Sequence, residues 1–192
     1  MGQYWNIINI DRREHLGHWA TESLRIIILL ADTWKGCRII CAGDYMTDSP
    51  PNVLTSEELA EIESLPEDIE TGRGRTLYTL ATEHYKHRTH WNRSFDLGGT
   101  VLRNRTKRVY VRRDAVVEEL AEYGGDIGSV LLANISWSND SSCAMRVDLS
   151  RGAWAGDRLD VVPLWAVENN EEWEDVTEDQ VKLTRFAISC NR

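Results

Sequence analysis

The sequence predicts an α+β fold made of two similar halves. Apolar runs alternate with capped helical segments, eight Trp residues supply large side chains for a core, and the chain repeats itself. Four pairs of segments match in the same order: NIDRREHL (9–16) with NRTKRVYV (104–111), IIILLADTW (26–34) with SVLLANISW (129–137), WKGCRIIC (34–41) with WAGDRLDV (154–161), and TSEELAEI (55–62) with TEDQVKLT (177–184). Because four matches rarely share one order by chance, we interpret them as an internal duplication with pseudo-two-fold symmetry.

The matches divide a single domain into three parts. Repeat A covers residues 1–65, a basic helical linker covers 66–98, and repeat B covers 99–192. A chain of 192 residues has the length of one domain, or of two small halves that share a core.

Each repeat is expected to begin with a hairpin, because residues 4–16 and 100–111 carry apolar and β-branched residues on both sides of polar turns. The continuous apolar runs 24–31 and 129–137 are expected to be strands that are buried on both faces. Residues 37–45 and 158–165 are expected to form further strands.

A helix is expected to close each repeat. Thr55 and Thr177 each precede a helical segment and are followed three residues later by Glu58 or Gln180, as in a capping box. Two extra helices are expected, one at 76–92 in the linker, and one in repeat B at 114–123, capped by Asp114 and ended by Gly124-Gly125.

The net charge of −9 is unevenly distributed. Residues 73–113 contain eleven Lys or Arg and two acids, residues 44–70 contain nine acids and no base, and residues 168–179 contain seven acids and no base. The basic middle is expected to lie across the acidic flanks or to form a solvated face; the alternative is a patch for a phosphate-bearing partner. Nucleic acid is disfavoured because an acidic protein repels a polyanion at long range.

The composition suggests a cytoplasmic protein without a membrane span. No apolar run approaches the roughly 20 residues that cross a bilayer, and the start of the chain lacks the pattern of a signal peptide. The four Cys residues show no metal-binding spacing, so we expect reduced, buried thiols. No cofactor motif is present, and no metal site is expected. Oligomeric state stays undetermined.

The Trp-x-Gly-x-Arg segment is the first candidate site. Trp34 and Trp154 could stack on a sugar or base, and Asp157 with Arg38 or Arg158 could bind hydroxyls or a carboxylate. The structural alternative gives Trp to the core, Gly to a tight turn and Arg to an ion pair. Trp, Gly and Arg occur in both copies, which favours the structural alternative for these three residues. Asp157 is not repeated, because Cys37 stands at its position in the first copy.

Two further stretches carry polar groups. The loop 42–51 contains Asp44 and Tyr45 after an expected strand, which suits metal binding or acid–base chemistry, or an ordinary turn. His84, His87 and His90 recur every third residue; two of them could share a metal ion with Glu83 on a helix, but a solvated basic face is the preferred interpretation.

The motifs MGQYW, NIDRRE, GDY, KRVYVR and SRGAWAGDR together resemble a family of proteins found in mushroom-forming fungi and in bacteria. Its members begin Met-Gly-Gln-Tyr-Trp and carry Trp-Ala-Gly-Asp-Arg, and the similarity extends over most of the chain. The resemblance implies no activity and supplies no catalytic residues.

The preferred hypothesis is a non-enzymatic binding protein for a small ligand or glycan, with Trp faces at the seam between the repeats. The alternatives are a hydrolase-type enzyme that uses Asp or His residues in the same seam, and an interaction protein that uses the basic segment 73–113. The expected ligand-binding residues are Trp34, Arg38, Asp44, Tyr45, Trp137, Trp154, Asp157 and Arg158.

Overall fold

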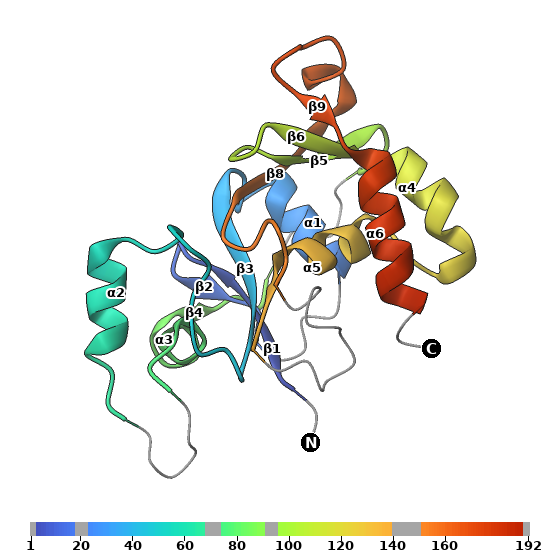
Figure 1. Cartoon of the computed structure of the whole chain (residues 1–192). Coiled ribbons are helices and arrows are strands. Elements are labelled where there is room, and N and C mark those ends of the chain that lie inside the picture. Colours follow the sequence, from blue (N-terminus) through green and yellow to red (C-terminus); the bar gives the residue numbers. More distant parts are fainter. Residues whose placement is uncertain (1–2, 18–22, 68–73, 91–95, 140–150, 190–192) are drawn as a thin grey trace.

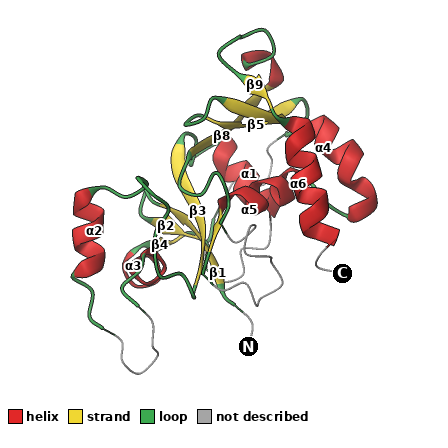
Figure 2. Cartoon of the chain, in the orientation of Figure 1, coloured by secondary structure: helices red, strands yellow, loops and turns green. Residues whose placement is uncertain are grey.

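The computed structural model describes residues 3–17, 23–67, 74–90, 96–139 and 151–189. Within these ranges the chain forms six α-helices and one open sheet of nine strands, with helices on both faces of the sheet (Figure 1, Figure 2). The predicted α+β class is therefore confirmed.

The sheet is mixed and has the hairpins of the two halves on either side of its centre. Its strands are β1 (Trp5–Asn9), β2 (Glu14–His15), β3 (Cys37–Gly43), β4 (Lys86–His87), β5 (Thr100–Asn104), β6 (Val109–Arg112), β7 (Ser136–Trp137), β8 (Arg158–Pro163) and β9 (Glu174–Asp175). They lie in the order β4-β2-β1-β3-β8-β5-β6-β9, and β7 also pairs with β3. The central pair is thus β3 with β8.

The helices divide between the two faces. They are α1 (Ser23–Ala31), α2 (Ser56–Glu63), α3 (Leu77–His84), α4 (Arg113–Leu120), α5 (Ile127–Ile135) and α6 (Thr177–Ser189), with short 3-10 turns η1 (Ala121–Tyr123) and η2 (Leu164–Ala166). Helices α1, α4, α5 and α6 share one large apolar cluster with the sheet, whereas α2 and α3 cover β1 and β3 from the other face (Figure 1). On that second face, η2 covers β5 and β8.

Both predicted hairpins are confirmed. β1 pairs antiparallel with β2, and β5 with β6. The last residue of each first strand is an Asn whose side-chain oxygen accepts turn amides: Asn9 accepts from Arg12 at 3.0 Å, and Asn104 accepts from Thr106 at 3.0 Å. This bond is typical of an Asx turn, in which the amide stabilises the reversal of the chain.

The prediction of strands at 24–31 and 129–137 is wrong for most of both runs, because they form α1 and α5; only Ser136 and Trp137 are in a strand, β7. A continuous apolar run has no period that separates a buried strand from a helix that is buried all round. Helices α1 and α5 lie against each other and against the sheet, so nearly every side is apolar. The deciding signal for α5 lies at the start of the run, where Asp126 and Ser129 form a capping box.

The predicted helix at 55–62 is confirmed as α2, and Thr55 and Glu58 form the expected capping box. The helix predicted at 76–92 begins with Thr76 as N-cap but ends at His84 and is followed by β4. At 177–184 a helix forms, α6, but Gln180 accepts a hydrogen bond from Asn134 at 2.6 Å instead of closing a capping box.

The helix expected at 114–123 is present as α4 followed by η1. Asp114 lies in its first turn and binds the Ala115 amide at 2.9 Å, but it is not the N-cap residue. Gly124 ends the segment with a left-handed backbone, at φ 68°. Among the described helices, none is long and apolar enough to cross a membrane.

Candidate functional site

The seam, which we define as the junction of β3 with β8, is closed by backbone hydrogen bonds. Arg38 pairs with Arg158 across it. The Gly36 amide donates to Leu159 at 2.8 Å, and the Gly156 amide donates to Ile39 at 2.8 Å. Both glycines have positive φ, at 72° and 80°. The sheet therefore runs continuously through the seam, and a ligand does not enter between the two strands.

Trp34 and Trp154 are core residues. Their exposed fractions are 0% and 2%, so neither ring offers a face to a ligand. The Trp34 indole donates to Glu14 at 2.7 Å, and Glu14 also accepts from Arg88 at 3.1 Å. This corrects the prediction that these two Trp residues stack on a ligand, and it agrees with the structural alternative for the motif.

Arg38 fastens α2 and the loop before it to the sheet. Its guanidinium donates to Asp11 at 2.7 Å, to the two Glu58 oxygens at 3.0 and 2.8 Å, and to the Val53 carbonyl at 2.6 Å. The Glu58 carboxylate, followed by Asp11, holds the pKa of Arg38 above its usual value. Because each of its three guanidinium nitrogens already donates within the fold, Arg38 positions neighbouring segments.

Asp11 also accepts a hydrogen bond from Arg158, the second arginine of the seam. Arg158 donates to Asp11 at 2.8 Å and to the Gly36 carbonyl at 3.0 Å. Burial alone would raise the pKa of Asp11, but hydrogen bonds from the backbone and side chain of Arg38 hold it below its usual value. The Arg158 side chain remains 51% exposed, so of the predicted residues at the seam it is the most accessible.

Asp157 has a structural partner. It accepts a hydrogen bond of 2.7 Å from the side-chain amide of Asn104, and Lys107 lies 3.6 Å away. Because Asn104 also binds the turn amides of its hairpin, Asp157 connects that turn to β8. This carboxylate is thus occupied within the fold.

The remaining predicted residues lie at the opposite end of β3. Asp44 exchanges hydrogen bonds with the backbone of Tyr4, and Tyr45 is 41% exposed. The Trp137 indole donates to the Asp48 carbonyl at 3.0 Å. Asp44 lies six residues after Arg38, which is roughly 20 Å at the usual rise of a strand. The eight predicted residues therefore form two groups, and Asp44 and Asp157 do not share a site.

The three histidines do not share a helix face. His84 ends α3, His87 lies on β4, and the His87 ring stands 5.1 Å from that of His15. The metal alternative is wrong for this reason, since it required one continuous helix. Within the described ranges, no group of three or more His, Cys, Asp or Glu is placed to hold a metal ion.

The basic segment 73–113 meets the acidic flanks where Arg75 lies 3.9 Å from Glu67 and where β6 pairs with β9, but most of its ion pairs are with acids outside these flanks. Ion pairs join its bases to acids elsewhere in the chain: Arg75 to Glu67, Arg88 to Glu14, Arg103 to Asp160, and Lys107 to Asp157. Asp160 is fully buried and binds Arg103 through both oxygens, at 2.8 and 2.9 Å. These four of the eleven bases are paired within the fold, which weakens the hypothesis of a phosphate-binding patch.

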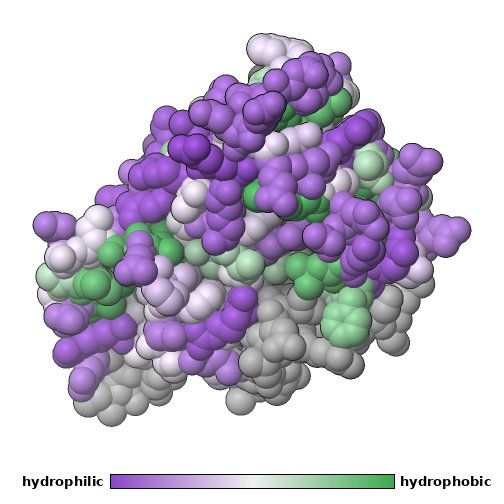
Figure 3. Space-filling view, turned by 45° about the horizontal axis from the view of Figure 1, so that its top comes forward, coloured by the Kyte–Doolittle hydropathy of each residue, from purple (hydrophilic) through white to green (hydrophobic). Residues whose placement is uncertain are grey.

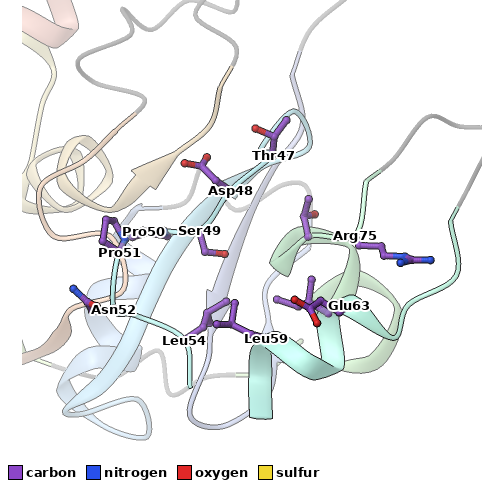
Figure 4. A pocket seen from close by; sticks show the side chains of 12 residues that line it. Thr47, Asp48, Ser49, Pro50, Pro51, Asn52, Leu54, Leu59, Glu63 and Arg75 are labelled. Atoms are coloured by element: carbon purple, nitrogen blue, oxygen red, sulfur yellow. The ribbon is translucent and has the colours of Figure 1, made fainter. Parts of the chain in front are cut away.

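A pocket of about 380 Å³ lies beside α2, and we call it the α2 pocket (Figure 4). It is lined by Thr47, Asp48, Ser49, Pro50, Pro51, Asn52, Leu54, Leu59, Ile62, Glu63, Arg75 and Thr76. The lining comes from the loop after β3, from α2 and from the start of α3. None of the eight predicted residues contributes to it.

The floor of the α2 pocket is apolar and its rim is charged. Leu54 and Leu59 lie side by side in Figure 4, and Leu59 is 46% exposed. Apolar surface gathers on the α2 side of the molecule among hydrophilic residues (Figure 3). At the rim, Arg151 lies 2.9 Å from Asp48 and holds the pKa of this carboxyl below its usual value. Glu63 forms no ion pair within the described part of the chain.

A second pocket, of about 600 Å³, lies between α4 and α6. Four of its charged side chains are paired with one another, Lys182 with Glu178 at 2.7 Å and Arg185 with Glu119 at 2.8 Å. A ligand there would have to displace these pairs, so the α2 pocket is the stronger candidate.

Sequence reasoning missed the α2 pocket because its floor consists of Leu and Ile residues that look like core residues. The available signal was Pro50-Pro51, which fixes the loop beside a helix whose apolar residues Leu59 and Ile62 are three apart. Searches of protein-family models, of curated proteins and of solved structures find no match to this chain, so the candidate site rests on its own geometry.

Proposed function

We propose that this protein is a non-enzymatic binding protein whose ligand occupies the α2 pocket. The observation that carries the proposal is an apolar floor of Leu54, Leu59 and Ile62, of which Leu59 is 46% exposed, beside the carboxylate of Glu63. Ligand sites are mostly apolar concavities with a few polar groups, and their volumes begin at about 300 Å³. The pocket has this composition and falls in this range.

The walls of the α2 pocket are held firmly, which favours a preformed site. Arg38 binds both Glu58 on α2 and the Val53 carbonyl in the preceding loop. Arg13 in the first hairpin donates to Glu61 at 2.7 Å. A preformed site loses little conformational entropy when it binds a ligand.

The charge of the rim favours a ligand with an apolar body and a cationic group. Of the two acids that line the pocket, Asp48 is paired with Arg151, whereas Glu63 forms no ion pair in the described ranges and is the carboxylate that a cation would meet. Arg75 also lines the pocket, but its side chain extends outward in Figure 4. An amine seated near Glu63 could place its apolar part on Leu54 and Leu59. The glycan expected from the sequence has no Trp ring in this pocket on which to stack.

We further propose that the two halves of the sheet are copies of one unit. Each half contributes a hairpin, a third strand antiparallel to its first strand, and a fourth strand parallel to its second: β1, β2, β3 and β4 in one half, and β5, β6, β8 and β9 in the other. The two hydrogen bonds across the seam, at Gly36 and at Gly156, support a two-fold relation. The unit then includes β4, so repeat A would extend beyond residue 65.

The helices do not all follow the two-fold relation between the halves of the sheet. α2 precedes β4 in the chain, whereas α6 follows β9, so the match of 55–62 with 177–184 finds no support in the element order. The face that carries the α2 pocket in the first half is covered in the second by η2 and Trp173. This divergence favours a binding site in the first half alone. Strands that fail to superpose in an experimental structure would refute the duplication.

The binding proposal can be tested with matched small probes. We expect hexylamine to shift the backbone amide signals of Leu59 and Glu63 in NMR spectra of the whole chain, and hexanoate at the same concentration to leave them in place. Glu63→Gln should weaken hexylamine binding up to about fivefold, the effect of an exposed ion pair. Leu59→Ser should weaken it by a similar factor, since about half of a Leu side chain can still be buried.

The matched control is Glu57→Gln, because Glu57 lies on the same helix and is exposed but does not line the pocket. This variant should bind hexylamine as the unchanged protein does. Equal shifts with hexanoate, or no shift at Leu59 and Glu63 with hexylamine, would refute the proposed ligand class.

A further inference from the structure

Asn9 is a buried residue with half of its amide group unsatisfied. It is 0% exposed, and its oxygen accepts from the Arg12 amide at 3.0 Å. Its side-chain nitrogen has no hydrogen-bond partner in the described part of the protein. A buried donor without an acceptor is costly, so such a group calls for an explanation.

The corresponding residue in the second hairpin shows what is missing. Asn104 is also 0% exposed and also binds its turn amides, but its side-chain nitrogen donates to Asp157 at 2.7 Å. Asn104 pairs with Leu159 on β8, and Asp157 stands two residues before Leu159.

The same register in the first half leads to a cysteine. Asn9 pairs with Ile39 on β3, and two residues before Ile39 stands Cys37. Residues two apart along a strand point to the same face. Cys37 therefore occupies, relative to Asn9, the position that Asp157 occupies relative to Asn104. A thiol is a poor acceptor, which accounts for the unsatisfied amide.

We propose that Cys37 is an oxidation site and that its sulfinate takes the role that Asp157 has in the second half. A cysteine sulfinate carries two oxygens and one negative charge on the atom after Cβ, as aspartate does. Its oxygens would accept from the Asn9 nitrogen. A cation is close in sequence as well: Lys107 follows Asn104 by three residues and lies 3.6 Å from Asp157, and Arg12 follows Asn9 by three.

Of the two described cysteines, Cys37 is the more accessible to an oxidant. Cys37 is partly exposed at the start of β3. Cys41 is buried, and burial raises the pKa of its thiol to about 12, which disfavours the reactive thiolate. Oxidation should therefore select Cys37 over Cys41.

The oxidant is hydrogen peroxide or another hydroperoxide. In the first step the Cys37 thiolate attacks one peroxide oxygen: an S–O bond forms, the O–O bond breaks, and hydroxide leaves. Sulfur loses two electrons and the peroxide gains them, which gives the sulfenic acid. Its conjugate base attacks a second peroxide in the same way, which yields the sulfinate and water.

The experiment uses the full chain with Cys143 and Cys190 replaced by Ser, so that Cys37 and Cys41 are its remaining thiols. Mass spectrometry after peroxide treatment should find two added oxygens on Cys37 and none on Cys41. The melting temperature should rise by about 2–5 °C, the shift expected when a buried donor gains an acceptor in a chain of this size. Cys37→Ser in the same background should show neither change.

Two further variants test whether Asn9 is the partner. In Asn9→Asp the oxygen that binds Arg12 is kept, but the donor becomes an acceptor, so oxidation should lower the melting temperature by repulsion between two anions. Cys37→Asp should slow hydrogen exchange of the Asn9 side-chain amide by about tenfold without any oxidant.

The proposal is overturned if Cys37 stays a thiol in the folded protein under conditions that oxidise it in the urea-unfolded chain. It is also overturned if oxidation lowers the melting temperature of the Asn9 protein. Should Asn9→Asp fail to fold, the exchange measurement decides, and an unchanged rate in Cys37→Asp would refute the role of Asn9.

Discussion

The contact between Asp157 and Asn104 offers a direct test of how the hairpin turns are stabilised. The substitution Asp157→Cys gives the second half the residue that the first half has. It removes a charge-assisted hydrogen bond of 2.7 Å and leaves the Asn104 amide, which is 0% exposed, without its acceptor. The second contact of Asp157, with Lys107, is weak because the lysine is 45% exposed.

The expected loss follows from these two contacts. An orphaned buried donor costs about 1.5–3 kcal/mol, and the exposed pair adds at most about 0.5 kcal/mol. The free energy of unfolding should therefore fall by about 2 kcal/mol. For a chain of this length, the melting temperature should then fall by about 4–8 °C.

Urea unfolding, followed by tryptophan fluorescence, measures this loss. Asp157→Asn is the matched control because it keeps a side-chain oxygen for Asn104 and loses the charge alone, so its cost should be about 1 kcal/mol. A loss below about 0.5 kcal/mol in Asp157→Cys would show that the bond does not stabilise the turn. The explanation of the unsatisfied Asn9 amide would then fail as well.

Two further outcomes follow from the seam. Gly156→Ala should destabilise the protein by more than about 2 kcal/mol, because φ is +80° and the new Cβ would lie 2.3 Å from a methyl carbon of Val53. The control is Gly99→Ala, where φ is +59° but no atom lies within 4 Å of the new Cβ. It should cost about 1 kcal/mol in the same urea assay. The lowered pKa of Asp11 contributes stability that is present above its ordinary value of 3.8 and lost as pH falls through the lowered value. In Arg38→Met the loss of stability on acidification should be smaller between about pH 2 and 4 than in the unchanged protein. Urea midpoints that fall equally with pH in both proteins would refute the role of Arg38 in lowering the pKa of Asp11.

The strands and hairpins were predictable where the sequence carries a period or a turn signal. Asn9 and Asn104 lie at the ends of apolar runs, and polar turn residues follow them, so the reversal of the chain is encoded locally. The capped helix α2 was predictable for the same reason, since Thr55 and Glu58 form its box within four residues.

The helices α1 and α5 were not predictable from their own residues. Both are apolar on nearly all sides because the sheet and other helices surround them, and that environment is a property of the assembled fold. The pocket was hidden for a related reason. Whether Leu59 is buried or exposed depends on where α2 lies, and α2 is placed by contacts from residues far away in the sequence.

The Trp-x-Gly-x-Arg motif connects the predicted site with the one that the structure supports. Arg38 was expected to bind a ligand, but its guanidinium binds Glu58 and the Val53 carbonyl and so fixes two walls of the α2 pocket. Arg158, which pairs with it across the seam, binds Asp11 and the Gly36 carbonyl, and none of its hydrogen bonds in the described part of the protein reaches a helix. The same motif therefore positions the walls of a pocket on one half of the sheet and only the seam on the other, so under the proposed function Arg38 would act on binding through the segments that it positions.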